Sequence, residues 1–273
     1  MKLHSILSVL LLVLLGTSPA AGQRAPETPP LRVLVYNIHA GKDASGTPNL
    51  ARVAEVVRAS RADVVLLQEV DRETERSGRE DQLATLEKLT DLHGAFGRTL
   101  PYPGGQYGIA VLSRWPIEAD SLHLLPIARP PADTARAPEP RGALHASVRT
   151  PGGRVHLVST HLDASRGDTY RLQQIAGVIE LAKTLRDSGE WVLVGGDFNS
   201  TPDSPAIGRM TASGWRDAWI GCGAGAGPTI PDDAPVRRID YLFLSPALHC
   251  DSAEVLESRA SDHRPVLFVV RPR

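Results

Sequence analysis

Residues 31–69 read LRVLVYNIHAGKDASGTPNLARVAEVVRASRADVVLLQE and contain two apolar runs on either side of a helical pattern. The runs 31–37 and 63–69 have the length and the Val/Leu content of buried β-strands. Between them, residues 49–60 place apolar side chains on one face of a helix: Leu50, Val53, Ala54 and Val57. A strand, a helix and a second strand in succession predict an α/β fold.

The same alternation continues to the end of the chain. Further strands are expected at 108–113, 143–149, 154–160, 191–196, 239–244 and 265–270, and further helices at 81–92 and 168–187. The Pro-rich stretch 126–142 and the Gly/Pro-rich stretch 221–235 are expected to be loops. Because no internal repeat or clear linker divides residues 31–273, we predict a single domain there.

The N-terminus has the pattern of a secretory signal peptide. Lys2 precedes an apolar run at 6–15, and small residues at 18–22 allow cleavage after Ala20 or Gly22. A membrane helix needs about twenty apolar residues, so this run is too short to span a bilayer. We therefore predict a signal peptide at 1–22, a Pro-rich leader at 23–30, and a secreted or periplasmic mature chain without stable membrane insertion. An uncleaved N-terminal anchor is the alternative.

The charge balance bears on the partners of the mature chain. Removal of residues 1–22 takes only Lys2 from the 30 basic residues and leaves all 31 acidic ones. A chain with this slight acidic excess does not hold nucleic acid by bulk charge, although a local basic groove can exist on it. Nucleic acid is therefore a possible but not a preferred partner, and we expect a monomer.

The chain has two cysteines, Cys222 and Cys250, in its C-terminal third. After export they would meet an oxidising compartment, where a disulfide is plausible. Two buried free thiols are the alternative, and the sequence leaves both open.

Four polar side chains directly follow apolar runs of the expected strands: Asn37, Glu69, His161 and Asp197. In α/β sheets, ligands bind beyond the carboxyl ends of the strands, so these side chains converge on one site if their strands run the same way. One such residue is an ordinary end to a strand. Four of them, together with Asp240 and the pair Asp262–His263, favour a common site.

The residue types indicate the chemistry of that site. Asn, Asp and Glu offer the hard oxygen ligands that Mg²⁺ or Mn²⁺ prefers. The chain has no His-Glu-x-x-His or Cys-x-x-Cys motif, which disfavours a dedicated zinc site. It also lacks the Gly-x-Ser-x-Gly motif of serine hydrolases and a Walker-type phosphate loop.

Seven short motifs stand in order along the chain: VYNIHAG (35–41), LLQEVD (66–71), YGIAVLSR (107–114), STHLD (159–163), GGDFNS (195–200), RRIDYLF (237–243) and SDHRP (261–265). With them the chain resembles the endonuclease/exonuclease/phosphatase superfamily, which includes DNase I, exonuclease III, sphingomyelinases and inositol-phosphate phosphatases. A lone GDFN would be weak support, whereas the seven motifs occur in the family's order and span essentially the whole mature chain. The resemblance implies a four-layer α/β sandwich over 31–273, with two packed mixed sheets flanked by helices.

The resemblance also implies a metal site and a base. Glu69 is expected to be the main ligand of Mg²⁺, with Mn²⁺ also acceptable, and Asn37 and Asp262 are expected near the metal. Asp197, helped by Asn199, is expected to orient and deprotonate the attacking water. Asp240 matches a polar position near a second metal or the nucleophile.

Further residues are implied to contact the phosphate. His161 and His263 are expected to donate hydrogen bonds to the phosphoryl oxygens, with Asp262 holding the ring of His263 in the useful tautomer. Tyr107 and Arg141 are expected to be additional phosphate contacts, together with Asn37.

These features predict an exported Mg²⁺-dependent phosphoesterase, preferably a phosphodiesterase for a lipid head group or another small phosphodiester. The alternatives are a secreted endo- or exonuclease and a non-catalytic binding module on the same fold. Against a nuclease, Asp71 follows Glu69 by two residues, where an acidic side chain would repel a polyanion. Against a membrane-surface enzyme, the loop 126–142 has no aromatic residue to insert into lipid.

Overall fold

The computed structural model describes residues 28–128 and 138–273, which form two packed six-stranded sheets. The first sheet has the order β11-β12-β1-β2-β4-β3. Its strands are β1 (Leu31–Asn37), β2 (Val64–Arg72), β3 (His93–Tyr102), β4 (Gly105–Ser113), β11 (Leu248–Val255) and β12 (Val266–Pro272). The expected signal peptide, residues 23–27 of the leader and residues 129–137 of the loop lie outside the described residues.

The second sheet has the order β5-β6-β7-β8-β10-β9. Its strands are β5 (Ile117–Leu124), β6 (Gly142–Thr150), β7 (Gly153–His161), β8 (Trp191–Asp197), β9 (Arg216–Asp217) and β10 (Asp240–Leu244). Each sheet combines parallel and antiparallel pairs, with β1 parallel to β2 and β7 parallel to β8. The predicted mixed sheets are therefore confirmed.

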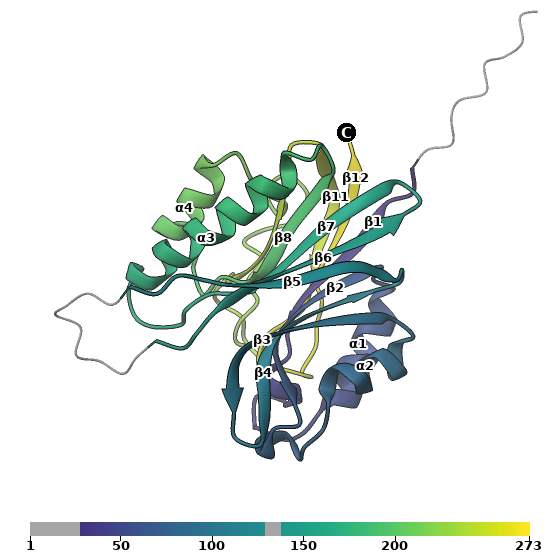
Figure 1. Cartoon of the computed structure of the whole chain (residues 1–273), viewed down its shortest axis with the longest axis vertical. Coiled ribbons are helices and arrows are strands. Elements are labelled where there is room, and N and C mark those ends of the chain that lie inside the picture. Colours follow the sequence, from purple (N-terminus) through teal and green to yellow (C-terminus); the bar gives the residue numbers. More distant parts are fainter. Residues whose placement is uncertain (1–27, 129–137) are drawn as a thin grey trace, which may run out of the picture.

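Helices cover the outer face of each sheet, which gives four layers (Figure 1). Helices α1 (Leu50–Ser60) and α2 (Gln82–Thr90) pack on the first sheet. Helices α3 (Thr169–Arg186) and α4 (Pro205–Ala212) pack on the second. No helix of the described residues is long and apolar enough to cross a membrane.

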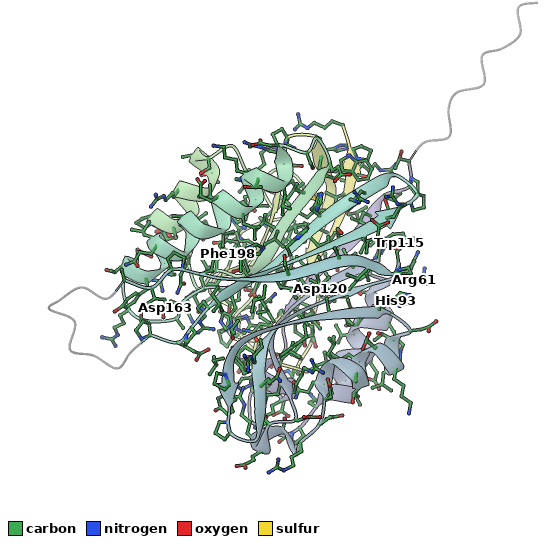
Figure 2. All side chains as sticks on the ribbon, in the orientation of Figure 1. Arg61, His93, Trp115, Asp120, Asp163 and Phe198 are labelled. Atoms are coloured by element: carbon green, nitrogen blue, oxygen red, sulfur yellow. A yellow bond between two sulfur atoms is a disulfide. The ribbon has the colours of Figure 1, made fainter. Side chains whose placement is uncertain are left out.

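The alternation of side chains along the strands explains their continuous apolar sequences. In β1, Val33 and Val35 face the core between the sheets, whereas Leu34 and Tyr36 face the helices. Both faces of the strand are therefore buried, as in other sheets covered on both sides. Side chains fill the space between all four layers (Figure 2). Trp215 and Trp219 are both buried.

Several elements were absent from the sequence prediction: β3, β5, β9, β11 and α4. Strand β5 reads IEADSLHL and is mostly exposed, so it lacks the apolar alternation that marks a buried strand. Strand β11 is likewise a half-exposed edge strand. Helix α4 is short, with Pro205 at its start and a cap in which the side chain of Ser204 accepts from the backbone N–H of Ile207.

Cys222 and Cys250 form a disulfide, with their Cα atoms 5.9 Å apart. Of the two alternatives that the sequence leaves open, the structure has the bonded one. The bond joins the loop after β9 to strand β11, and so connects the second sheet to an edge of the first.

Two paired histidines, His156 buried and His145 half-buried, generate a prediction about acid stability. The Nε2 atom of His145 lies 2.8 Å from Nδ1 of His156 on the neighbouring strand, and Nε2 of His156 lies 2.6 Å from Glu190. Burial, followed by the charges of His156 and His123, lowers the pKa of His145 from 6.5 to about 4. The folded state therefore binds a proton at His145 more weakly than the unfolded chain does. The neutral His145 pair contributes its full stability to the fold above pH 6.5, and this contribution is lost as the pH falls towards 4.

Substitution His145→Gln is expected to flatten the decline of the urea midpoint between pH 6.5 and 4. The exposed residue His93 provides a matched control, and His93→Gln should keep the wild-type decline. Equal declines in all three proteins would contradict the assignment of this pH dependence to His145.

Candidate active site

A cavity of about 350 Å³ opens at the edge where the central strands of both sheets end. In register, Asn37 lies opposite Gln68 on the first sheet, and His161 lies opposite Asp197 on the second. Seven of the sequence-predicted residues line the cavity: Glu69, Tyr107, Arg141, His161, Asp197, Asn199 and His263. Asn37 and Asp240 lie behind this lining and are hydrogen-bonded to it. Asp262 is not part of the lining.

A bulge in β2 carries Glu69 into the site. The register between β2 and β4 shifts between Leu67 and Val70, and Glu69 has a left-handed backbone with φ of 58°. Such a conformation is strained for a non-glycine residue and is typical of functional positions. The side-chain amide of Asn37 donates to Glu69 Oε1 at 3.0 Å and to Asp197 Oδ2 at 3.1 Å, so it ties the two carboxylates together.

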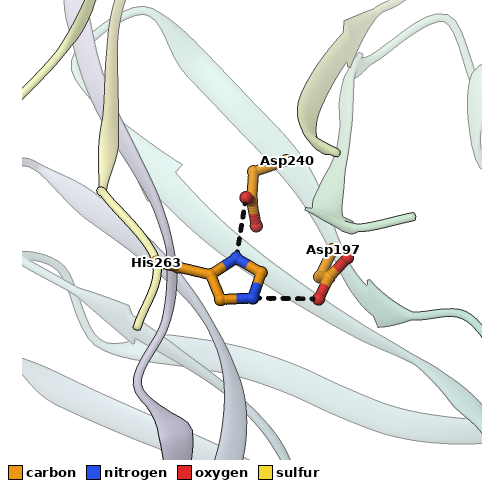
Figure 3. A group of neighbouring side chains, drawn as sticks. All are labelled: Asp197, Asp240 and His263. Atoms are coloured by element: carbon orange, nitrogen blue, oxygen red, sulfur yellow. Dashed lines mark hydrogen bonds and ion pairs between the residues drawn. The ribbon is translucent and has the colours of Figure 1, made fainter. Parts of the chain in front are cut away.

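The second buried group consists of Asp197, Asp240 and His263 (Figure 3). Ring atom Nδ1 of His263 lies 2.9 Å from Asp240 Oδ2, and Nε2 lies 3.8 Å from Asp197 Oδ2. Burial opposes a charge on this imidazole, but the carboxylate of Asp240 outweighs it and raises the pKa of His263 to about 10. Burial and the charge of Asp240 raise the pKa of Asp197 to about 7. The group therefore pairs a protonated imidazole with a carboxylate that can take up a proton near neutral pH.

The expected role of Asp262 is wrong in one respect, because Asp240 and not Asp262 holds the ring of His263. Strand β10 is antiparallel to β8 and places Asp240 directly opposite Asp197, which brings its carboxylate to Nδ1 of the ring. The carboxylate of Asp262 instead accepts from the hydroxyl of Ser261 and lies 3.8 Å from Nδ1 of His39. The side chain of Asp262 is 34% exposed, which places it at the rim of the site.

His161 lies between Arg141 and Asp197. Arg141 Nη1 lies 2.9 Å from Nδ1 of His161, and because a guanidinium has only protons to give, Nδ1 must accept. Burial and the charge of Arg141 lower the pKa of His161, so the ring is neutral and its one proton is on Nε2. That atom lies 3.5 Å from Asp197 Oδ2, which can accept its proton. The amide nitrogen of Asn199, 3.1 Å away, is itself a donor and cannot accept from Nε2–H. His161 can therefore donate from Nε2 without carrying a charge.

Arg76 lines the cavity and was not found from the sequence. Its Nε and Nη2 atoms each lie 2.8 Å from an oxygen of Asp71, whose side chain is fully buried. The argument that Asp71 would repel a polyanion is therefore wrong, because this bidentate pair neutralises its charge beneath the site. A fully buried carboxylate requires a compensating positive charge, and Arg76, in the turn after β2, is close enough along the chain to supply it.

The described residues include one group of three side chains that could hold a metal ion, Asp197, Asp240 and His263, with ligand atoms within 4.8 Å of one another. Two of these groups are already hydrogen-bonded to each other, since His263 Nδ1 donates to Asp240 Oδ2. The second oxygen of Asp240, Oδ1, is buried without a hydrogen-bond partner among the described residues. Glu69 is hydrogen-bonded to the neutral amide of Asn37 and has no cationic partner among the described residues. The carboxylate of Glu69 is therefore available to bind a cation.

The fold and the site are those of a class of proteins whose members are hydrolases acting on phosphoesters. The chain belongs to the Endonuclease/Exonuclease/phosphatase family, whose model matches residues 34–263. The Escherichia coli (strain K12) protein YbhP, described as uncharacterized, is 31% identical over 249 residues, which cover 86% of this chain and 94% of YbhP.

Solved structures of the family have the same fold. An endonuclease/exonuclease/phosphatase from Beutenbergia cavernae DSM 12333 has a TM-score of 0.76 at 27% identity, covering 89% of this chain and 72% of that one. A mannosyl-6-phosphatase from Bacteroides thetaiotaomicron VPI-5482 has a TM-score of 0.73 at 19% identity, covering 88% of this chain and 99% of that one. At this lower identity the likeness concerns the fold alone.

The assignment of the His263 partner can be tested directly. The Nδ1 proton of His263 is expected to give a downfield proton NMR resonance in the wild type, because it lies in a charge-assisted hydrogen bond to Asp240. Substitution Asp240→Asn should shift or remove this resonance, and Asp262→Asn should leave it in place. The opposite pattern would show that Asp262 holds the ring.

Proposed function

We propose that this protein is an exported Mg²⁺-dependent phosphoesterase and that its substrates are phosphodiesters. The observation that carries the proposal is the arrangement around the cavity, where Asp197, with its pKa raised to about 7, faces two imidazoles and lies beside Glu69. Membership of the family supports hydrolysis of phosphoesters. The metal, the diester preference and the export are proposals.

The residues of the site fit Mg²⁺. Glu69 offers a carboxylate without a cationic partner among the described residues. Asn37 turns its amide nitrogen to Glu69 while its Oδ1 accepts from the backbone N–H of His39, so it would present oxygen to an ion only after its amide turns, and Asp262 supplies a carboxylate at the rim. An all-oxygen set with few carboxylates is the usual protein environment of Mg²⁺. When bound, this ion supplies positive charge that polarises the phosphoryl group. We propose Glu69, Asn37 and Asp262 as the residues that hold it.

Asp197 is proposed to remove the proton of the attacking water. A general base works best when its pKa lies near the working pH, and burial together with Asp240 brings Asp197 into this range. The backbone N–H of Asn199 donates to Asp197 Oδ1 at 2.8 Å and holds the carboxylate in orientation. Asn37 holds the other oxygen.

Four donors surround the space that a phosphoryl group would occupy: Tyr107, Arg141, His161 and His263. Burial and the charge of Glu69 raise the pKa of Tyr107, so its hydroxyl keeps its proton and can donate. The protonated His263 and the Nε2–H of neutral His161 can both donate to oxygens that gain charge in the transition state. Since Asp240 and Arg141 already orient these rings, little reorganisation is needed during the reaction.

The charge balance favours a diester over a monoester. Arg76 is paired with Asp71, Arg141 lies 3.3 Å from Glu139, and His263 lies between two carboxylates. Each of these cations is therefore already compensated. A phosphomonoester carries nearly two negative charges at neutral pH and a diester carries one, so the diester demands less uncompensated positive charge.

A secreted nuclease is the second candidate, because the pairing of Asp71 with Arg76 removes one objection to a nucleic-acid substrate. The acidic balance of the chain still disfavours it. The N-terminal sequence pattern and the disulfide Cys222–Cys250 support the proposal of an oxidising compartment.

Hydrolysis of bis-p-nitrophenyl phosphate provides the test. With Mg²⁺ we expect turnover that EDTA abolishes, and Glu69→Ala should reduce kcat/KM by about 100-fold or more because the proposed ion loses its main ligand. Glu55→Ala, on the exposed face of α1, is the matched control and should keep wild-type activity.

The same assay distinguishes the alternatives. We expect p-nitrophenyl phosphate, the matching monoester, to be the poorer substrate. Faster hydrolysis of the monoester would overturn the diester preference, and Glu69-dependent nicking of plasmid DNA would favour the nuclease. Absence of Mg²⁺-dependent hydrolysis of all these substrates by folded protein would favour a non-catalytic binding module.

A further inference from the structure

A second hollow adjoins the phosphoryl cavity and has a volume of about 560 Å³. The two share four lining residues, Tyr102, Glu139, Arg141 and Ala164, so they are continuous. Its remaining wall includes Asp163, which lies at the end of the sandwich opposite Trp115 and Arg61 (Figure 2). We call this hollow the side groove. A group attached to a phosphate in the first cavity can extend directly into it.

The walls of the side groove combine apolar surface with acidic groups. Leu100, Pro138 and Pro140 supply the apolar part. Glu139 is 42% exposed, and the single guanidinium, Arg141, is already paired with it. Because the described lining holds two carboxylates and one paired cation, an anionic group in the side groove would be repelled.

Tyr102 is a fixed aromatic wall between the two cavities. The guanidinium carbon of Arg76 lies 4.1 Å from the centre of its ring, and Nη1 of Arg76 donates to its hydroxyl at 3.3 Å. Arg76 is itself held by the buried Asp71. The guanidinium covers one face of the Tyr102 ring and draws on its electron density, which weakens the ring as a site for an ammonium group.

We propose that the side groove binds the alcohol part of the phosphoester, and that this alcohol is uncharged and rich in hydroxyls, as a polyol or a sugar is. The proposal rests on the phosphoester hydrolysis proposed above and specifies its substrate class. The apolar wall and the edge of Tyr102 contact the carbon skeleton, and Glu139 accepts hydrogen bonds from hydroxyls. Arg76 acts as a positioning residue that keeps Tyr102 in place.

Isothermal titration calorimetry in the presence of Mg²⁺ tests the proposal without turnover of a diester. The probes are inorganic phosphate, myo-inositol 1-phosphate and phosphocholine. We expect myo-inositol 1-phosphate to bind about tenfold more tightly than inorganic phosphate, because it adds contacts in the side groove. Phosphocholine should gain no such advantage.

Variants then locate the advantage in the side groove. Tyr102→Ala is expected to bring the affinity ratio of myo-inositol 1-phosphate to inorganic phosphate to about one, whereas Tyr102→Phe, which keeps the ring, should retain it. Glu139→Gln is a second variant and should reduce the ratio through the lost acceptor charge. Glu139→Gln therefore tests the side groove even if Tyr102→Ala does not fold.

The outcomes separate this inference from the proposed function. Equal affinities for the two phosphates in the wild type, tighter binding of phosphocholine, or an unchanged ratio in both Tyr102→Ala and Glu139→Gln would overturn the inference. Absence of binding by any probe would count against the side groove and the phosphoryl site together. A preserved polyol preference in a protein that hydrolyses no diester would support the side groove and reject the proposed function.

Discussion

Compensation of buried charge is the constraint on which this structure depends. The edge of the sandwich collects carboxylates from several strands, and each one is costly to bury without a partner. Asp240 is compensated by His263, and Asp71 by Arg76. Asn37 joins Glu69 to Asp197 through hydrogen bonds but brings no charge. The negative charge that remains at Glu69 and Asp197 is what makes this edge suited to a cation and a polarised phosphoryl group.

The same constraint explains why two chemically similar residues behave differently. Asp197 and Asp240 lie directly opposite each other on neighbouring strands. His263 lies within hydrogen-bonding distance of Asp240 and farther from Asp197, so the second carboxylate has the weaker stabilisation of its charge. Burial, followed by the charge of Asp240, raises the pKa of Asp197, and His263 offsets this only in part. Asp197 is therefore suited to accept a proton, while Asp240 supports the ring.

Much of this arrangement could be predicted from the sequence, because buried strands have continuous apolar runs and their polar ends stand out. The eight expected strands are present, and Asn37, Glu69, His161 and Asp197 come together. Asn37, His161 and Asp197 do so at strand ends, as predicted, whereas Glu69 lies at a bulge within β2. Edge strands such as β5 and β11 escaped prediction because β5 is mostly exposed and β11 half-exposed, so neither shows the apolar alternation of a buried strand. Such strands depend on pairing with neighbours that the local sequence does not reveal.

The contribution of Arg76 could not be predicted, and the bulge in β2 gives the physical reason. In a regular strand, side chains two residues apart share a face, so Asp71 would stand beside Glu69. The shift in register between Leu67 and Val70 breaks this rule, and Asp71 is buried under Arg76. The partner of His263 was likewise hidden, because Asp240 becomes adjacent only through the pairing of β8 with β10.

The disulfide has a consequence for how the molecule meets other chains. Strand β11 is the outermost strand of its sheet, and an exposed edge of this kind readily pairs with a strand of another molecule. Here the loop after β9 runs along it, with a bridge between Gly223 and Ala253 and a hydrogen bond from Ala253 N–H to the carbonyl of Cys222. The bond from Cys222 to Cys250 secures this loop to the edge. By holding this loop on the edge of β11, the disulfide also protects the sheet against edge-to-edge aggregation.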